Sequence, residues 1–371
     1  MSGYCDSSEL LRDQVAEATE SQSILRIAGG NSKASLGNAV PDTPEHPVRP
    51  LSTRSHCGII SYEPTELVVT VRSGTALQSL NAELEKAGQM LPFEPPELPD
   101  STIGGVLACG FSGPRRPFSG SARDYVLGVR VINGAARDLS FGGQVMKNVA
   151  GYDVSRLQIG AWGTLGVMLD ISMKVLPKPE VEMTLVQESA PGDTAAFATF
   201  LRRPLPLSGA LLIGRQRYFR LSGSEAAVRA AALGMGGDSV EHGDELWRSV
   251  RDHTHEFFTS PSEAGKTLWR ISVADHAPAL SLSGDFVYDW AGAQRWLLSD
   301  EPADNIFEQA RALGGHAMRF GPGNSEDPAF QPLNAAMLKL QSRLRDSFDP
   351  QRLFNRGLFH PELDQSLETN R

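Results

Sequence analysis

FGGQVMKNVAGYDVSRLQIGAWGTLGV, residues 141–167, is the stretch around which the rest of the chain is organised. Its glycines can take positive φ angles and lie against a flat or phosphorylated ligand, where any Cβ would intrude. Tyr152, Asp153 and Arg156 place polar groups between the glycines, and apolar residues on either side can anchor the segment. The stretch predicts one half of a cofactor-binding cradle. Its glycines stand at positions 142, 143, 151, 160, 163 and 166.

Length and composition limit the class of protein. A chain of 371 residues is long for a single hydrophobic core, so we expect two domains. Hydrophobic residues make up 40% and charged residues 21%, as in ordinary soluble proteins. No apolar run approaches the ~20 residues that span a bilayer, and the N-terminus lacks signal-peptide order, so we expect a cytoplasmic protein. A net charge of −9 without a clustered basic face argues against a nucleic-acid partner.

A glycine-rich turn follows the first predicted strand. The strand covers Ser23–Ile27, and the sequence then reads AGGNSK over Ala28–Lys33. A strand that runs into a turn with exposed backbone amides is an arrangement that holds a pyrophosphate. An ordinary turn is the alternative, and the motif alone does not decide between the two.

A second glycine-rich segment lies about seventy residues further on. STIGGVLACGFSG covers Ser101–Gly113 and follows Leu91–Pro99, which prolines stiffen by fixing φ. Arg115 and Arg116 come next, and alternating apolar residues predict a strand over Tyr125–Ile132. The segment predicts the second half of the cradle.

Four motifs in this order carry a family resemblance: AGGNSK, STIGGVLACGFSGPRR, RDYVLGVRV, and GGQVMKNVAGYDVSRL with GTLGV. Together they resemble the FAD-binding domain of the vanillyl-alcohol-oxidase and p-cresol-methylhydroxylase (PCMH) type. Within that group the chain is most similar to the FAD-binding subunits of bacterial glycolate oxidases (glycolate dehydrogenases). The resemblance covers about residues 24–177, with a weaker match at the C-terminus.

The expected fold is α+β with three parts. The resemblance implies a PCMH-type FAD-binding domain of two α/β subdomains over residues 1–179. Alternating strands and helices over residues 180–330 favour a smaller antiparallel sheet with helices on one face, which corresponds to the family's cap domain. Residues 331–371 return to the FAD domain. There, Leu333, Met337, Leu340 and Leu344 predict one apolar helix face that packs on it.

The resemblance also implies cofactor contacts, residue by residue. The first loop binds the pyrophosphate, the second lines the ribityl chain and flavin edge, and the third packs on the ribose and adenine. Many relatives carry a histidine in the first loop that binds the flavin covalently. This chain has Asn31 in that neighbourhood, so the FAD is expected to be noncovalent. Asn355, in a segment that resembles the closing motif, approaches the flavin. The implied contacts are Gly29, Gly30, Asn31, Ser32, Ser101, Thr102, Gly104, Gly105, Gly110, Ser112, Asp124, Gly163, Gly166, Val167 and Asn355.

Catalytic candidates lie in the second domain. Arg270, Arg295 and Arg319 can each clamp a substrate carboxylate, because a guanidinium offers it two hydrogen bonds. His316 can act as a general base near neutral pH. For any single one of these residues, a structural role in a strand is the alternative. No metal is expected, because His253 and His255 would point apart on a helix.

The resemblance implies a flavoprotein subunit that oxidises a 2-hydroxy acid, with glycolate as the expected substrate and glyoxylate as product. The three cysteines are widely spaced and cannot hold an iron–sulfur cluster by themselves. The expected partners are therefore an iron–sulfur subunit and a larger homologous FAD-containing subunit, with membrane association only through that complex. Two alternatives remain open: a noncatalytic FAD-holding relay or structural subunit, and a D-lactate dehydrogenase-like flavoenzyme.

Overall fold

The computed structural model describes residues 5–40, 42–143, 153–259, 266–321 and 327–364. Part of the glycine-rich stretch, residues 144–152 with Gly151 and Tyr152, lies outside the described residues. The chain divides into two compact units. Unit 1 comprises Met1–Phe111, Ser121–Pro177 and Pro332–Arg371, and unit 2 comprises Ser112–Gly120 and Lys178–Gln331.

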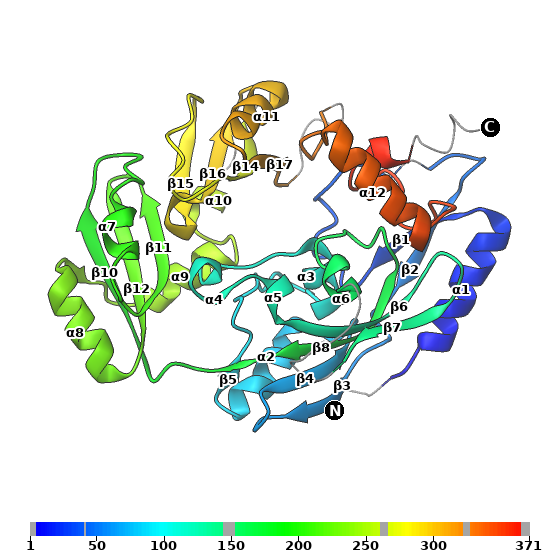
Figure 1. Cartoon of the computed structure of the whole chain (residues 1–371), viewed down its shortest axis with the longest axis horizontal. Coiled ribbons are helices and arrows are strands. Elements are labelled where there is room, and N and C mark those ends of the chain that lie inside the picture. Colours follow the sequence, from blue (N-terminus) through cyan, green and yellow to red (C-terminus); the bar gives the residue numbers. More distant parts are fainter. Residues whose placement is uncertain (1–4, 41, 144–152, 260–265, 322–326, 365–371) are drawn as a thin grey trace. The chain divides into compact units, whose positions relative to one another are not determined.

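Among the described residues, unit 1 contains three separate sheets with helices against them, one of which is the antiparallel pair β5–β9 (Figure 1). Strands β1 and β2 pair in parallel, and a five-stranded antiparallel sheet has the order β3-β4-β8-β6-β7. The helices are α1 (Ser8–Ser21), α2 (Leu77–Lys86), α3 (Ile103–Cys109), α5 (Ala122–Tyr125), α6 (Val154–Leu157), α12 (Ala335–Phe348) and the 3-10 helix η2 (Pro361–Leu363). The strands are β1 (Ile24–Ala28), β2 (Val48–Ser52), β3 (Ile59–Glu63), β4 (Val68–Arg72), β5 (Gln89–Met90), β6 (Val126–Ile132), β7 (Asp138–Gly142), β8 (Val167–Lys174) and β9 (Leu176–Pro177).

Strand β8 joins the two cores of unit 1. Val167 and Leu169 pack with α1 and the β1–β2 pair, whereas Ile171 and Met173 pack with α2 and α3. A strand that is covered in this way reads as a nearly continuous apolar run, here VMLDISMK. These two cores of sheet and helix confirm the expected pair of α/β subdomains, and strand β8 contributes side chains to both.

Unit 2 is built on one eight-stranded antiparallel sheet of order β13-β10-β12-β11-β15-β16-β14-β17 (Figure 1). Its strands are β10 (Val181–Glu188), β11 (Leu207–Ile213), β12 (Gln216–Gly223), β13 (Asp238–Ser239), β14 (Thr267–Ser272), β15 (Asp285–Asp289), β16 (Gln294–Ser299) and β17 (His316–Arg319). Its helices are α4 (Arg116–Ser119), α7 (Phe197–Leu201), α8 (Glu225–Met235), α9 (Gly243–Arg251), α10 (Glu256–Thr259), α11 (Ala303–Ala312) and the 3-10 helix η1 (Trp290–Gly292).

The antiparallel sheet of unit 2 was expected, but its helices do not share one face. In β11, Ala210 and Leu212 pack with α7 and α8, whereas Leu211 packs with Trp247 of α9. Because side chains alternate between the faces of a strand, these helices lie on opposite faces. The expectation of helices on a single face was therefore wrong: β11 is apolar on both sides and buries both.

The C-terminal segment binds unit 1 differently from the sequence expectation. Met337 and Leu340 of α12 are 41% and 61% exposed, so the predicted apolar face of that helix does not pack inward. The attachment comes after the helix instead. Leu353 accepts a hydrogen bond from the Leu25 amide at 2.7 Å, and the Asn355 amide donates to the Leu25 carbonyl at 2.9 Å. These bonds extend the β1 edge and bring Asn355 to the start of the first glycine loop.

Candidate functional site

The loop after β1 presents a row of backbone amides. Thr53 and Asn355 still bond the end of β1, through Ala28 and Ile27, respectively. Beyond that point, within the described part of the chain, the amides of residues 29–33 donate no hydrogen bond. Asn31 has a positive φ of 60°, which turns the backbone in the middle of this row. Consecutive N–H groups around such a turn form an anion-binding concavity, and amides left without a partner need one.

The two glycines of this loop are required by the chain itself. A Cβ on Gly29 would lie 2.1 Å from the Thr102 hydroxyl oxygen, and a Cβ on Gly30 would lie 1.6 Å from the Asp100 carbonyl oxygen. The sequence reasoning assigned such glycines to close ligand approach. The structure shows that Gly29 and Gly30 allow the first loop to pack directly against residues 100–102.

Helix α3 supplies that second wall, but its first amides are already bonded. The Ile103 amide donates to Thr75 and the Gly104 amide to Ser73, at 3.0 and 2.8 Å. The Gly105 amide donates to the N-cap hydroxyl of Thr102 at 3.3 Å. The amides available to an anion are therefore those of the first loop, and α3 contributes surface and side chains.

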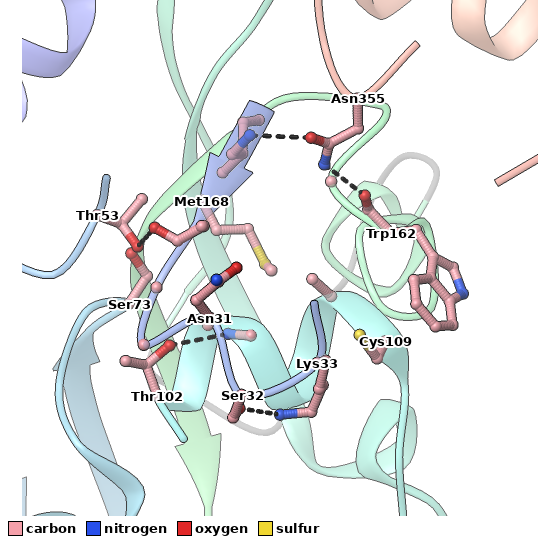
Figure 2. A pocket seen from close by; sticks show the side chains of 18 of the residues that line it. Asn31, Ser32, Lys33, Thr53, Ser73, Thr102, Cys109, Trp162, Met168 and Asn355 are labelled. Atoms are coloured by element: carbon pink, nitrogen blue, oxygen red, sulfur yellow. Dashed lines mark hydrogen bonds between the residues drawn. The ribbon is translucent and has the colours of Figure 1, made fainter. Parts of the chain in front are cut away.

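The GTLG turn and Asn355 close the site on the other side (Figure 2). The Asn355 side chain accepts from the Ile27 amide at 2.9 Å and donates to the Trp162 carbonyl at 2.8 Å. A Cβ on Gly163 would lie 2.7 Å from Asn355 Nδ2, and one on Gly166 would lie 2.6 Å from a Val131 methyl carbon. Asn355 thus ties β1 to the glycine-rich turn as well as facing the cavity.

These walls enclose about 830 Å³ of empty space, counting the open mouth, within unit 1. The cavity brings together most of the residues predicted to bind the cofactor. Those that line it are Gly29, Gly30, Asn31, Ser32, Thr102, Gly104, Gly105, Gly163, Gly166 and Asn355.

Five predicted cofactor residues lie elsewhere. Ser101 is adjacent to the cavity and bonds Ser32 at 3.1 Å. Gly110 ends α3 with a φ of 67°, and Val167 is buried in the core. The Asp124 carboxylate accepts from the amide and hydroxyl of Ser121, which closes a capping box at the start of α5. Asp124 therefore serves its own helix, and Ser112 belongs to unit 2.

Sequence reasoning missed Lys33, the basic residue of the loop. Its ammonium donates to Ser32 Oγ at 3.2 Å (Figure 2) and to Ser101 Oγ at 3.4 Å. Burial lowers the pKa of Lys33, because a desolvated ammonium is less stable. Nearby, burial raises the pKa of the Cys109 thiol to about 12, so Cys109 stays protonated at neutral pH. The sequence signal for this residue was a lysine that directly follows the glycine-rich motif GGNS.

A second cluster of functional groups lies in unit 2, around Trp290. The indole N–H donates to the Gly113 carbonyl at 2.9 Å, and the backbone amide donates to Asp289 Oδ1 at 2.7 Å. The guanidinium carbon of Arg116 lies 4.3 Å from the ring centroid, and that of Arg270 lies 5.2 Å away. These distances are typical of cation–π contacts.

The charges of this cluster influence one another. Arg270 donates from Nε to Gln294 Oε1 at 2.8 Å. Desolvation, followed by repulsion from Arg116, lowers the pKa of Arg270 to about 10, against the opposing attraction of Asp289. Desolvation and then the charges of Arg270 and Arg116 lower the pKa of His316. The imidazole is therefore biased towards its neutral form beside two cations.

Arg295, which was predicted as a candidate carboxylate ligand like Arg270, does not join these residues. Arg295 is fully buried and donates to three backbone carbonyl groups, those of Gly292, Ala277 and Pro278, at 3.2, 2.6 and 2.7 Å. In the β14–β16 register, Ile271 is opposite Arg295 and Trp296 is opposite Arg270. Directly opposite residues share a face, so the two arginines point to different sides of the sheet. Arg295 binds backbone carbonyl groups within unit 2, whereas Arg116 lies with Arg270 at the Trp290 ring.

Comparisons with known proteins agree with the fold and the cavity. A family model described as an FAD binding domain matches residues 4–155. Glycolate oxidase subunit GlcE of Escherichia coli (strain K12) is 45% identical over 361 residues, covering 97% of this chain and 99% of that protein. Glycolate oxidase subunit GlcD of Bacillus subtilis (strain 168) is 35% identical over 138 residues, covering 37% of this chain and 29% of that protein.

Two solved structures of alkyldihydroxyacetonephosphate synthase superpose with a TM-score of 0.65 over 95% of this chain and 74% and 76% of theirs. Because the sequence identity is only 13–14%, this superposition shows a shared fold alone. No helix in the described ranges is long and apolar enough to cross a membrane. The near-complete match in length is the strongest of these findings. The chain carries an FAD-binding domain and belongs to the family of the glycolate oxidase subunit GlcE.

Proposed function

We propose that this chain is an FAD-holding subunit of a glycolate-oxidising enzyme, with the cofactor's diphosphate bound at residues 29–33. The observation that carries the proposal is the row of five amides, at residues 29–33, that have no hydrogen-bond partner among the described residues and that line the cavity. A diphosphate offers oxygen acceptors for such a row, and Lys33 offers a compensating positive charge. When bound, FAD supplies an acceptor for the hydride of a 2-hydroxy acid.

The proposal extends to partners and location. The relative of 45% identity is named as one subunit of a glycolate oxidase, and the GlcD protein matches 37% of this chain. Cys5, Cys57 and Cys109 form no disulfide and no shared metal cluster among the described residues. We therefore assign onward electron transfer to an iron–sulfur subunit and expect a larger homologous flavin subunit beside it. The complex works in the cytoplasm and meets the membrane only through its other members.

The test uses the purified chain and anaerobic glycolate. Flavin absorbance in the chain, and its bleaching by glycolate alone, would place turnover in this subunit. Flavin that bleaches only after the partner subunits are added supports the alternative of a noncatalytic relay subunit. Bleaching by D-lactate in preference to glycolate supports the D-lactate dehydrogenase alternative, which a 34% identity over 128 residues to a D-lactate dehydrogenase of Anaerostipes hadrus also favours. Absence of any flavin after reconstitution would refute the proposal.

Replacing Lys33 by methionine should weaken FAD binding about 10- to 100-fold, the equivalent of losing one charge-assisted hydrogen bond of about 1.5–3 kcal/mol. Lys33→Arg keeps the charge and should retain most of the affinity. Fluorescence titration of the apo chain with FAD gives both dissociation constants. The wild-type affinity should also fall more steeply with salt than that of Lys33→Met, because an ion pair is screened. Equal affinities for all three chains would remove Lys33 from the diphosphate site.

The FAD should be released completely when the chain is denatured by heat or acid. No histidine is among the residues lining the described cavity, and Asn31 has no nucleophilic nitrogen. Cys109 also faces the cavity, but with its pKa near 12 it remains a thiol, and the thiolate is the reactive form. Mass spectrometry of the denatured chain should therefore give the mass of the polypeptide alone. A mass increased by one flavin would contradict this.

A further inference from the structure

We propose that Cys5 and Cys57 are a redox-sensitive modification site. Under oxidising conditions they form a reversible disulfide that fastens the segment before α1 to the loop between β2 and β3. Both residues belong to unit 1, neither lines the cavity described above, and no bond joins their sulfur atoms in the structure. The inference depends on the contacts of these two segments and not on the proposed function.

The backbone pairs the two cysteines directly. Cys5 and Cys57 are opposite each other in an antiparallel bridge. The Cys5 amide donates to the Cys57 carbonyl and the Cys57 amide donates to the Cys5 carbonyl, both at 3.1 Å. In a pair that exchanges both bonds, the Cα atoms are about 5.5 Å apart and the side chains project from the same face. A disulfide spans Cα atoms about 4.4–6.8 Å apart, so this pair lies within its range.

A small movement would bring the two thiols into bonding distance. The Cβ atoms of opposite residues lie about 4.5–5.5 Å apart, whereas a disulfide prefers about 3.8 Å, so they must approach by about 1 Å. Cys5 and Asp6 are exposed, so packed side chains do not hold this segment rigidly. Exposure also leaves the bond open to reductants, and exposed disulfides are the labile ones. We therefore expect a reversible bond.

The surroundings of Cys5 make it the thiol that reacts first. Its Sγ lies 3.6 Å from Ser7 Oγ, and that hydroxyl can donate a hydrogen bond to the thiolate, which is the attacking form. Cys57 is half-buried and follows as the resolving thiol. Cys109 is different, because burial raises its pKa to about 12 and keeps it protonated.

A low-molecular-weight disulfide, such as oxidised glutathione, is the oxidant that we assign. The Cys5 thiolate attacks one sulfur of the oxidant, whose S–S bond breaks, and one glutathione thiolate leaves. The Cys57 thiolate then attacks Cys5 Sγ, the mixed disulfide breaks, and the second glutathione thiolate leaves. The two cysteines lose two electrons, which reduce the oxidant to two thiols, and their two protons pass to the leaving thiolates.

The loop that carries Cys57 belongs to the framework of the cofactor cavity. Its Thr53 lines the cavity and accepts the His56 amide at 2.9 Å. The fully buried His56 ring accepts the Ser7 amide at 3.1 Å and bonds Asp170 of β8 at 3.1 Å. A disulfide would add a covalent bond beside these contacts. Because it would also close a loop of about 50 residues in the unfolded chain, oxidation should stabilise unit 1.

The test is equilibration of the full-length chain in glutathione buffers of increasing oxidised fraction, followed by an acid quench and mass spectrometry. The wild type should lose the mass of two hydrogen atoms, peptide mapping should join Cys5 to Cys57, and dithiothreitol should restore the original mass. Cys57→Ser should stop at the mixed disulfide, heavier by one glutathione, and Cys5→Ser should not form the bond. Cys109→Ala is the matched control and should form it as the wild type does.

Thermal unfolding followed by circular dichroism tests the fastening. The oxidised wild type should unfold about 5 °C or more above the reduced chain, and Cys5→Ser should show no difference between the two buffers.

Three outcomes would overturn the inference. A wild-type chain that carries only glutathione adducts shows that the two thiols do not meet. A disulfide that includes Cys109 assigns the wrong pair. A Cys5–Cys57 bond without a rise in the unfolding midpoint refutes the fastening role. The mass readout needs no bound flavin, so a failure of the proposed cofactor function leaves this test intact.

Discussion

The Gly30→Ala variant should be purified without flavin. A Cβ at this position would lie 1.6 Å from the carbonyl oxygen of Asp100, a backbone atom that cannot rotate away. The loop or the 100–102 segment must therefore shift, and overpacking of this kind typically costs about 1–3 kcal/mol even where side chains can adjust. The shift would displace the amides of residues 29–33, which have to meet the diphosphate together. We expect FAD affinity to fall by about two orders of magnitude, because each 1.4 kcal/mol is a factor of ten.

Gly143→Ala is the matched control for that experiment. Gly143 belongs to the glycine-rich stretch, but an added Cβ would meet nothing within 4 Å, and its φ lies outside the left-handed region. The control should keep its flavin. The ratio of flavin to protein after purification, followed by titration of the apo chain with FAD, measures the difference. A Gly30→Ala chain with full flavin content would show that residues 29–33 do not bind the cofactor.

The second large effect is expected at Arg345, in α12. Replacing Arg345 by methionine should lower the free energy of unfolding by about 3–5 kcal/mol, because it leaves buried carboxylates without their cation. Arg345 is 2% exposed, and its guanidinium lies 2.7 Å from Asp364 and bonds the Phe354 carbonyl at 3.0 Å. Asp349, also fully buried, accepts the amides of Leu353 and Phe354 at 2.9 Å. This network holds the segment that delivers Asn355 to the cavity.

Urea unfolding of the wild type, Arg345→Met and Arg343→Met measures that loss. Arg343 is exposed on the same helix, so its replacement should change stability little. Burial raises the pKa of Asp349 and Asp364, and Arg345 opposes that rise. Without Arg345 the folded state should bind protons more readily than the unfolded state. The deficit of Arg345→Met should therefore shrink as the pH is lowered from 7 towards 5. An unchanged midpoint for Arg345→Met would contradict the proposed role of the network.

Local patterns correctly predicted several parts of this protein. Strand β1 followed by a glycine-rich turn, strand β6 and the antiparallel sheet of unit 2 all follow from short-range apolar periodicity and turn residues. Gly104 and Gly105 of the second glycine-rich segment, and Gly163 and Gly166 of the stretch 141–167, line the described cavity. These glycines were predicted to allow the close approach of a ligand, whereas most of the close contacts that they permit are with other segments of the chain. A sequence shows that a Cβ is forbidden, but it does not show which atom forbids it.

Side-chain orientation in the second domain could not be read in the same way. Arg270 and Arg295 both lie in strands with similar surroundings in sequence, and both were equally good carboxylate ligands. A shift of one residue in strand register moves every side chain to the other face. The observed register puts Arg295 into the core and Arg270 beside Trp290 and Arg116. No periodicity within either strand encodes that choice.

The sequence by itself determined the order of the motifs, the antiparallel α+β architecture and the loop that presents its amides, because these depend on neighbours within a few residues. The tertiary structure alone decided which distant groups meet. Asn355 accepts a hydrogen bond from Ile27 in strand β1, 328 positions away in the sequence. Arg116 contacts Trp290 because residues 112–120 belong to unit 2, although the segments before and after them belong to unit 1. Such contacts form when core packing and sheet register bring distant segments of the chain together. The free energy that offsets the entropy cost of closing these long loops comes from the whole core, and not from the few residues at the two ends of each loop.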